Sequence, residues 1–133
     1  MKIAYRFISL LLICVVLSAA LSACVPFYYP EYYGNSKCEL SLVGEATMTS
    51  VYDEETGYYD VYIDGVAENN TGNDVTGCYV TFIIYDSDGN VVGTAEDYLS
   101  ELKNGEKWRF RASGYTGYEP SSFAKDELYG YDW

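Results

Sequence analysis

Histidine is missing from this 133-residue chain and cations are scarce, with 8 Lys and Arg against 20 Asp and Glu. Without an imidazole, the chain offers no Ser-His-Asp or Cys-His nucleophile, no histidine general base and no histidine-ligated zinc. The formal charge of -12 also argues against nucleic-acid binding, because a protein that binds phosphates needs a basic surface. We therefore expect no cofactor and no nucleic-acid partner.

Apolar and aromatic residues, in contrast, are abundant: 49% of the residues are hydrophobic and 16 are tyrosines. This content excludes a disordered acidic tail, which lacks the apolar residues that a core needs. Tyrosine favours strands over helices, and the length corresponds to one ordinary domain. The composition therefore predicts one folded β domain.

The N-terminal segment is organised like a secretory signal. Lys2 and Arg6 form a basic region, and a largely apolar run from Phe7 to Leu21 follows, which is short for a membrane span. The run ends in Leu21-Ser22-Ala23-Cys24, which resembles a bacterial lipobox. That resemblance implies cleavage of a signal peptide, residues 1–23, and lipidation of Cys24, and two acyl chains on one residue anchor a protein stably. The alternative is an uncleaved anchor helix with an incidental cysteine.

The same resemblance predicts the location of the mature protein. A lipidated Cys24 implies a protein held by its lipid on the cell membrane or the outer membrane, facing outside the cytoplasm. Residue 25 is Val rather than Asp, which by resemblance does not mark retention at an inner membrane.

Residues 24–37 form a lipid-anchored tether rich in tyrosine and proline. Pro26, Pro30 and Gly34 prevent regular structure in this stretch. The aromatic side chains have three interpretations: they lie at the lipid interface, they pack on the following domain, or they form a surface for a glycan. These side chains are Phe27, Tyr28, Tyr29, Tyr32 and Tyr33.

Residues 38–133 show the period of two that is typical of strands. Turns that contain Gly, Asn and Asp separate these segments about every ten residues. About six such strands predict an all-β, antiparallel sandwich that is large enough to bury a core. The expected strands are 39–51, 61–68, 78–85, 91–99, 107–112 and 127–133, and the expected turns are 53–57, 69–74, 86–90 and 103–106.

The third expected strand carries a family resemblance. Phe82-Ile83-Ile84-Tyr85-Asp86 resembles the motif that names the FxLYD domain family, with Ile84 in place of its leucine. The resemblance implies a small Ig-like β-sandwich of about six or seven strands, found in bacterial secreted proteins and lipoproteins, whose molecular function is largely undefined. Three flanking segments are also similar to the family pattern: 65–72, 88–93 and 102–110.

The motif also has a structural explanation. Phe82 and Ile84 share one parity, so we expect both in the core, where each contributes roughly 2 to 3 kcal/mol. Tyr85 would lie on the opposite face with its hydroxyl in water. Asp86 would begin the next turn by accepting bonds from backbone N–H groups.

Two cysteines, Cys38 and Cys78, belong to the predicted domain. Their parities place both sulfurs inward, and an even pair in an exported protein favours a disulfide. Such a bridge would close a loop of about 40 residues and stabilise the fold by roughly 4 kcal/mol. The alternative is two buried free thiols. No CxxC spacing is present, so we do not expect a redox-active pair.

Charged segments supply the remaining candidate sites. The oxygens of Asp86, Asp88 and Asn90 are of the kind that calcium binds, but Gly89 precedes Asn90 instead of following it, so the order favours a hairpin turn. Asp53-Glu54-Glu55 is likewise expected to be a solvated loop. We therefore predict no metal site.

Lys107, Arg109 and Arg111 form a basic stripe on one face of an expected strand. One interpretation is a docking site for an acidic polymer or partner. The other is pairing with acids on neighbouring strands, which is worth under about 1 kcal/mol a pair. The large excess of acids favours pairing.

Together these features favour a lipid-anchored, non-enzymatic interaction or accessory domain, with a protein or glycan partner in the cell envelope. We expect no catalytic residues, because a sandwich this small offers no evident cleft. One alternative is a glycan- or peptide-binding module that uses exposed tyrosines or an edge strand. Another is a spacer domain without a ligand.

Overall fold

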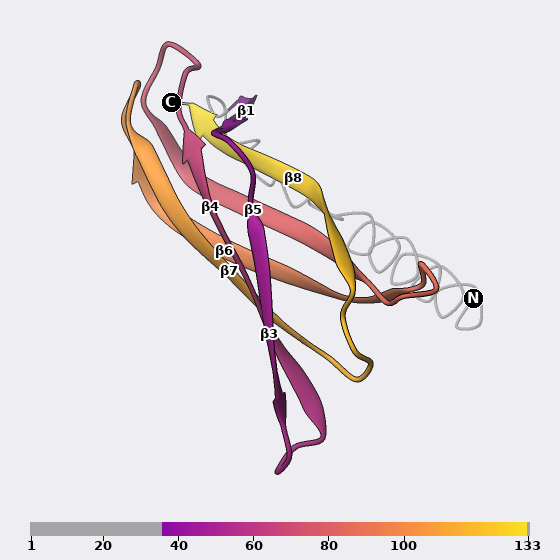
Figure 1. Ribbon diagram of the computed structural model, residues 1–133. Coiled ribbons are helices and arrows are strands. Elements are labelled where there is room, and N and C mark those ends of the chain that lie inside the picture. The colour runs from indigo at the N-terminus through magenta and orange to yellow at the C-terminus, as the bar shows by residue number, and fades with distance from the viewer. Residues whose placement is uncertain (1–35, 133) are drawn as a thin grey trace, which may run out of the picture. The chain divides into compact units, whose positions relative to one another are not determined.

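The computed structural model describes residues 36–132, which form eight β-strands and no helix (Figure 1). Within this range, no helix is long and apolar enough to cross a membrane. The predicted signal peptide, Cys24 and most of the tether lie outside the described residues. The strands are β1 (Lys37–Glu39), β2 (Ser41–Leu42), β3 (Thr47–Asp53), β4 (Tyr58–Glu68), β5 (Val75–Tyr85), β6 (Val91–Leu102), β7 (Lys107–Thr116) and β8 (Ser122–Asp132).

The strands form one antiparallel sheet in the order β1-β8-β5-β6-β7-β4-β2, and β3 pairs with β4 beside β2. The junction of β6 and β7 is narrow, since Glu96 and Ser113 are its single register pair. The sheet therefore curls at this junction, and its two halves face each other as in a small sandwich or barrel. The prediction of an all-β, antiparallel fold is confirmed.

Side chains of alternate residues on the facing strands fill the core. Phe82 is 1% exposed and its ring centroid lies 5.7 Å from those of both Phe110 and Phe123. Ile84 is fully buried beside it on β5, so both motif residues are core residues as predicted. The other buried apolar side chains are Leu40, Val61, Ile63, Ala67, Val75, Cys78, Val80, Ala95, Leu102, Trp108, Phe110, Ala112 and Leu128.

Gly114 permits the curl between β6 and β7. A Cβ atom at this position would lie 2.0 Å from the carbonyl oxygen of Thr94, a distance at which no side chain fits. Where the two strands then separate, the backbone N–H of Arg111 donates to Asp97 Oδ2 at 2.9 Å. The Asp97 carboxylate thus replaces a backbone partner that the neighbouring strand no longer supplies.

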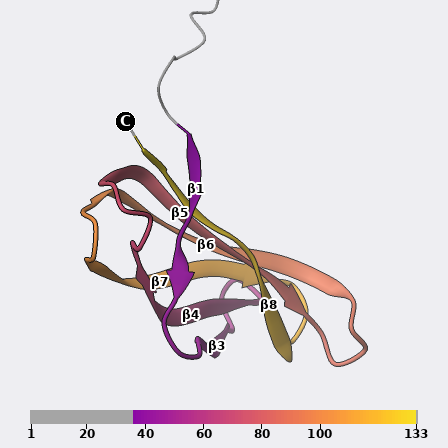
Figure 2. The same ribbon diagram turned by 90° about the horizontal axis from the view of Figure 1, so that it is seen from above.

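The first expected strand is wrong as a single element. Leu40 N donates to Leu128 O at 3.1 Å, which continues the pairing of β1 with β8, whereas the next two residues pair with β4. Figure 2 shows this segment passing from beside β8 to the edge of β4. Gly44, with φ of 73°, then turns the chain into β3. Between 39 and 51 the chain changes its pairing partner once, from β8 to β4, and is interrupted once by the turn at Gly44, and it therefore forms three strands there.

Asn69 joins two loops at one end of the sheet. Its side chain is fully buried, and its Nδ2 donates to the carbonyl oxygens of Asn73 at 2.8 Å and Leu102 at 2.9 Å. Its Oδ1 accepts from the backbone N–H and the hydroxyl of Thr71. All hydrogen-bonding groups of the Asn69 side chain are therefore bonded within the protein. The segment 65–72, which resembles the family pattern, thus has a structural role.

Candidate binding surface

Exposed aromatic side chains gather where β3, β4 and β7 meet. The seven exposed large hydrophobic residues in the described range include five at this end of the fold, between 47% and 71% exposed, while the other two are Val91 and Tyr98. Exposed aromatic side chains that gather in one region are characteristic of a binding surface. We call this group the tyrosine patch: Val51, Tyr52, Tyr58, Tyr115 and Tyr118.

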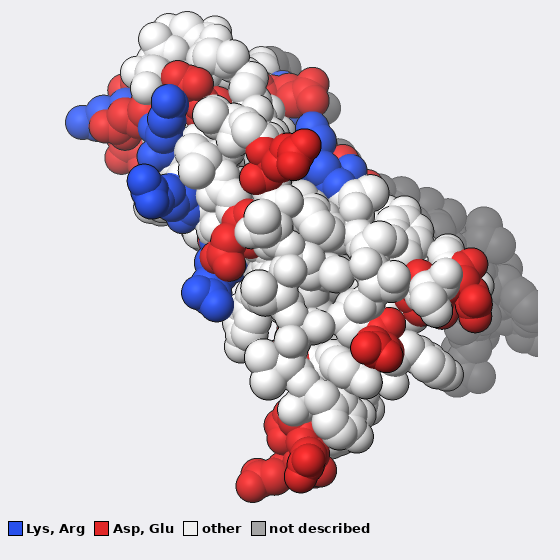
Figure 3. Space-filling view, viewed as in Figure 1, with Lys and Arg blue, Asp and Glu red and all other residues white. Residues whose placement is uncertain are grey.

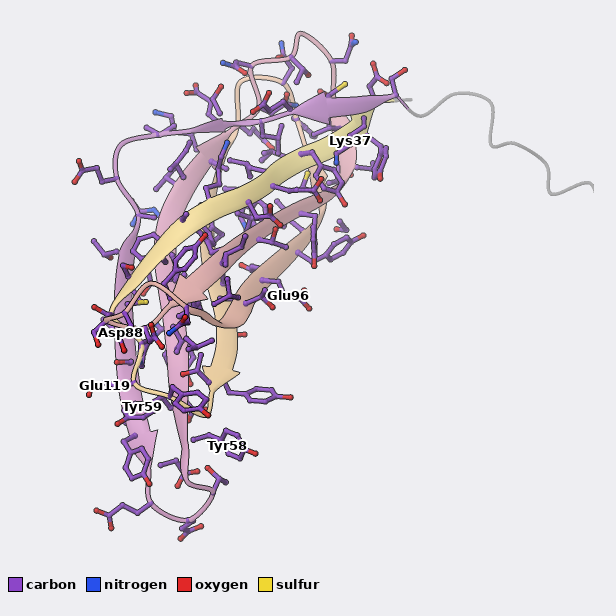
Figure 4. The ribbon with its side chains drawn as sticks, turned by 90° about the vertical axis from the view of Figure 1, so that its right-hand side faces the viewer. Lys37, Tyr58, Tyr59, Asp88, Glu96 and Glu119 are labelled. Carbon is purple, nitrogen blue, oxygen red and sulfur yellow. The ribbon has the colours of Figure 1, made fainter. Side chains whose placement is uncertain are left out.

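Strand register places part of the patch on the outer face of the sheet. Val51 lies opposite Asp60, and Asp60 lies opposite Tyr115, so the three side chains form one row across β3, β4 and β7. The rings of Tyr58 and Tyr115 meet edge to face, with centroids 5.9 Å apart and planes at 83°. Figure 4 shows Tyr58 and Tyr59 close to the hairpin end of β4.

Short contacts hold the patch against the scaffold. Tyr52 packs on Tyr59 with ring centroids 4.9 Å apart and planes at 52°, and Tyr59 is half-buried against the core. The Thr116 hydroxyl, which is buried, donates to the carbonyl oxygen of Tyr118 at 2.7 Å and fixes the turn after β7. The rings therefore sit on an ordered base, which lowers the entropy lost when a ligand binds.

The hydroxyls of the patch are candidates for binding another molecule. Among residues 36–132, no hydrogen-bond partner is found for the hydroxyls of Tyr52, Tyr58, Tyr115 or Tyr118. A tyrosine with an exposed ring and a free hydroxyl can pack against apolar groups and hydrogen-bond at its tip, which is why tyrosine is enriched at interfaces.

Acidic side chains surround the patch. Asp60 lies within it, and Asp53, Glu54 and Glu55 form the adjacent hairpin tip, which Figure 3 shows without any Lys or Arg on it. The Asp53 carboxylate accepts the Glu55 N–H and the Thr56 hydroxyl, both at 2.9 Å, and these bonds lower the pKa of Asp53. The sequence has no Lys or Arg between residues 37 and 103, so this end of the fold attracts cations.

A second group of tyrosines behaves differently. It contains a row across β6, β5 and β8 that consists of Tyr98, Tyr79 and Tyr129. The ring centroid of Tyr129 lies 5.4 Å from that of Tyr131. The Tyr79 hydroxyl donates to Glu96, which raises the pKa of Tyr79 to about 12. Tyr98 is 61% exposed, whereas the other three tyrosines make their contacts within the protein. We call Tyr79, Tyr129 and Tyr131 the inner cluster for this reason, although Tyr79 lies on the outer face of the sheet.

Lys37 occupies the exposed side of the inner cluster. Its ammonium lies 4.0 Å from the centre of the Tyr129 ring and 2.6 Å from Glu127 Oε1, which raises the pKa of Lys37. A hollow of about 340 Å³ adjoins the cluster. It is lined by Lys37, Glu39, Lys125, Asp126, Glu127, Leu128 and Tyr129. Four of these five charged side chains form the ion pairs Lys37–Glu127 and Lys125–Glu39. The hollow is therefore less open to a ligand than the tyrosine patch.

Both cysteines of the domain are free in the structure. Cys78 is buried, and burial raises the pKa of its thiol, while Cys38 is half-buried against the core. The two residues lie on β5 and β1 with β8 between them, and Cys38 is opposite Gly130. The inward parity is confirmed, but the structure contains two thiols instead of the disulfide that parity favoured.

The remaining predicted sites have structural partners. The Asp86 carboxylate accepts the N–H groups of Asp88 at 2.9 Å and Asn90 at 2.8 Å, and its bonds with Asn90 are the main cause of its lowered pKa. It therefore acts as a hairpin cap, as predicted, and Gly89 has a φ of 83°. No cluster of three or more metal-ligating side chains occurs in the described part of the chain.

The basic stripe faces acids on β4. Arg111 is opposite Asp64 and forms an ion pair with it at 3.8 Å, and Lys107 is opposite Glu68. The Arg111 guanidinium also lies 4.7 Å from the Tyr62 ring centre. These contacts favour the cross-strand interpretation over a docking site.

Sequence reasoning did not locate the tyrosine patch, although its residues were visible. The paired tyrosines at 58–59 and those at 115 and 118 are separated by about half the domain, and only the β4–β7 pairing brings them together. Comparison with known proteins adds no assignment, because no family model, curated protein or solved structure matches the chain. The FxLYD resemblance therefore stays a prediction from the motifs.

Proposed function

We propose that this chain is an extracytoplasmic lipoprotein, anchored to a membrane through Cys24, whose FxLYD-like β domain is a non-enzymatic interaction or accessory module. The lipobox at residues 21–24 supports the anchor. The tyrosine patch supports the binding role, and its exposed rings, whose hydroxyls have no partner within residues 36–132, are the single observation that carries this proposal.

The geometry of the patch favours a protein or peptide ligand over a glycan. A sugar ring stacks best on a flat aromatic surface, whereas the ring planes of Tyr58 and Tyr115 are inclined by 83° and that of Tyr52 is inclined by 52° to the neighbouring Tyr59. Side chains of a polypeptide can enter between inclined rings and pack against their faces and edges. The acidic surroundings further favour a ligand that carries cations.

Site-specific photocross-linking of the full-length protein in its native cells tests this function. A photoreactive phenylalanine in place of Tyr118 should give a discrete cross-linked envelope protein, and the same probe in place of Val91 should not. Tyr115→Ser in the Tyr118 probe variant should reduce the product strongly. Equal cross-linking from both positions, or a cross-link to polysaccharide alone, would contradict the proposal.

The anchor requires a separate measurement. Cys24→Ala should abolish incorporation of a radioactive fatty acid and release the protein from the membrane fraction. Undiminished labelling of this variant would refute lipidation at Cys24 without bearing on the patch.

A further inference from the structure

The two outer edges of the sheet differ in how they are protected. At one edge, β8 is covered by β1 over Tyr129–Tyr131, and its uncovered part contains a register shift and the charged run Lys125-Asp126-Glu127. Short covering strands, bulges and charges are the usual means of preventing another strand from pairing. At the other edge, β3 pairs with β4 along seven residues, without a register shift, Pro, Lys or Arg.

β3 is also accessible on both faces. Five of its seven residues are exposed, including Val51 at 61% and Tyr52 at 51%. Among the described residues its pairing partner is β4 alone, so its other edge presents unpaired backbone N–H and C=O groups. An open, regular and accessible edge of this kind is the template on which an extended peptide can add as a further strand.

The side chains beside this edge define the chemistry of an added strand. On the inner face the edge presents Met48 and Tyr52, which would contact apolar residues. On the outer face, Val51 lies next to Asp60, and Asp53 follows at the acidic tip. Because strand residues alternate between faces, an added strand with cations on one face and apolar residues on the other would match both.

We propose that β3 binds an extended, cationic peptide segment by strand addition, with Lys or Arg alternating with apolar residues. This inference rests on the proposed binding function and specifies its mode and partner. Charge favours such a segment over a second copy of this chain, because the copy would bring another acidic hairpin tip and no cation between residues 37 and 103. The adjoining tyrosine patch would contact the side chains of the bound segment.

Fluorescence anisotropy with the full-length protein in detergent micelles tests the inference. The probe is a labelled heptapeptide of alternating Lys and Val. Its controls are the corresponding Glu and Val peptide and a Lys and Val peptide N-methylated at alternate residues, which keeps the side chains but cannot form a backbone ladder. We expect the unmodified cationic peptide to bind, and each control peptide to bind more weakly by about tenfold or more.

Two matched variants separate specific pairing from general attraction to an acidic protein. Val51→Lys places a cation on the edge, whereas Val91→Lys makes the same charge change at a residue that is equally exposed, 63% against 61%, outside β3. Val51→Lys should weaken peptide binding about tenfold, and Val91→Lys by less than about twofold. Hydrogen exchange of the β3 amides should slow when the peptide binds.

Alternative outcomes each identify what is wrong. Equal binding of the N-methylated and unmodified peptides, or unchanged hydrogen exchange of the β3 amides, would overturn strand addition. If the double variant Tyr115→Ser and Tyr118→Ser abolished peptide binding in that case, the tyrosine patch would remain the binding site. Sedimentation of the wild type as a dimer that Val51→Lys converts to a monomer would identify a second copy as the occupant and overturn the peptide. A melting curve for each variant confirms that the comparison is made on folded protein.

Discussion

The inner cluster and the tyrosine patch contain the same residue type in two different environments. In the inner cluster, Lys37 covers Tyr129 and Glu96 accepts the Tyr79 hydroxyl. In the patch, the rings pack on one another while the hydroxyls have no partner among the described residues. A tyrosine whose ring and hydroxyl already have partners in the protein contributes to stability. A tyrosine whose ring is held in place but whose hydroxyl has no partner is available to a ligand.

The largest expected loss of stability comes from a mutation in the hydrophobic core beneath both tyrosine groups. Phe82→Ala removes a ring that packs between Phe110 and Phe123, and truncations of this kind cost about 3 to 5 kcal/mol. Thermal unfolding should show a loss of well over ten degrees in Tm, since each kcal/mol shifts a domain of this size by about 4 to 8 °C. Lys107→Ala, on the outer face, should change Tm very little. An unchanged melt for Phe82→Ala combined with loss of binding would mean that the motif is a binding site.

The comparison of the two tyrosine groups makes a smaller and more direct prediction. Tyr129→Ser removes contacts with Tyr79, Tyr131 and Lys37 and should destabilise the fold by about 1 to 3 kcal/mol. Tyr118→Ser should change stability by less than about 0.5 kcal/mol and should reduce ligand binding. Chemical denaturation of both variants measures the difference, and equal losses of stability would remove the distinction between the groups.

Alkaline titration tests the hydrogen bond that Tyr79 of the inner cluster donates to Glu96. The neutral form of Tyr79 is favoured in the folded state because its hydroxyl donates to Glu96, which raises its pKa to about 12. Its contribution to stability is therefore complete below the unfolded pKa, about 10, and is lost as the pH rises toward 12. The ultraviolet spectrum of the Glu96→Gln variant should show one more tyrosine that ionises at a lower pH than it does in the wild type. A titration identical to that of the wild type would show that this bond does not form in solution.

The smallest effect concerns the two thiols below the inner cluster. Cys38 is half-buried and should react with an alkylating reagent in the native protein, whereas Cys78 is buried with a raised pKa and should react only after unfolding. Mass spectrometry of the unreduced protein after export measures both. A protein that takes up no reagent even when unfolded would contain the disulfide, and β1, which carries Lys37, would then be fixed covalently to β5.

Much of the fold could be predicted from alternation within strands. The inward positions of Phe82, Ile84 and Trp108 follow from a period of two, and the turns at Gly57 and Gly89 follow from the need for positive φ. The division of the first strand could not be predicted, because Leu40 is inward in either arrangement and the change of pairing partner leaves no mark on parity. The start of β8 at residue 122 was also missed, since its charged residues 125–127 hide the pattern.

The binding surface was less predictable than the core. A period of two separates the inner from the outer face but does not distinguish an outer residue that has a partner from one that is free. Tyr79 and Tyr115 both lie on outer faces, and only the neighbouring strand gives one of them a carboxylate. Long-range pairing, which determines such neighbours, is not contained in local sequence.

The crossing of the chain at Leu40 also determines how the domain would respond to mechanical load. A force applied at Ser36 acts first on β1, which is three residues long and joined to β8 by an antiparallel ladder. Such a short ladder yields at low force, but the chain then continues into β2 at the opposite half of the sheet. In the proposed lipoprotein, a pull through the tether would therefore detach β1 before the force reaches β3, β4 and the tyrosine patch, so the binding surface would keep its shape under low tension.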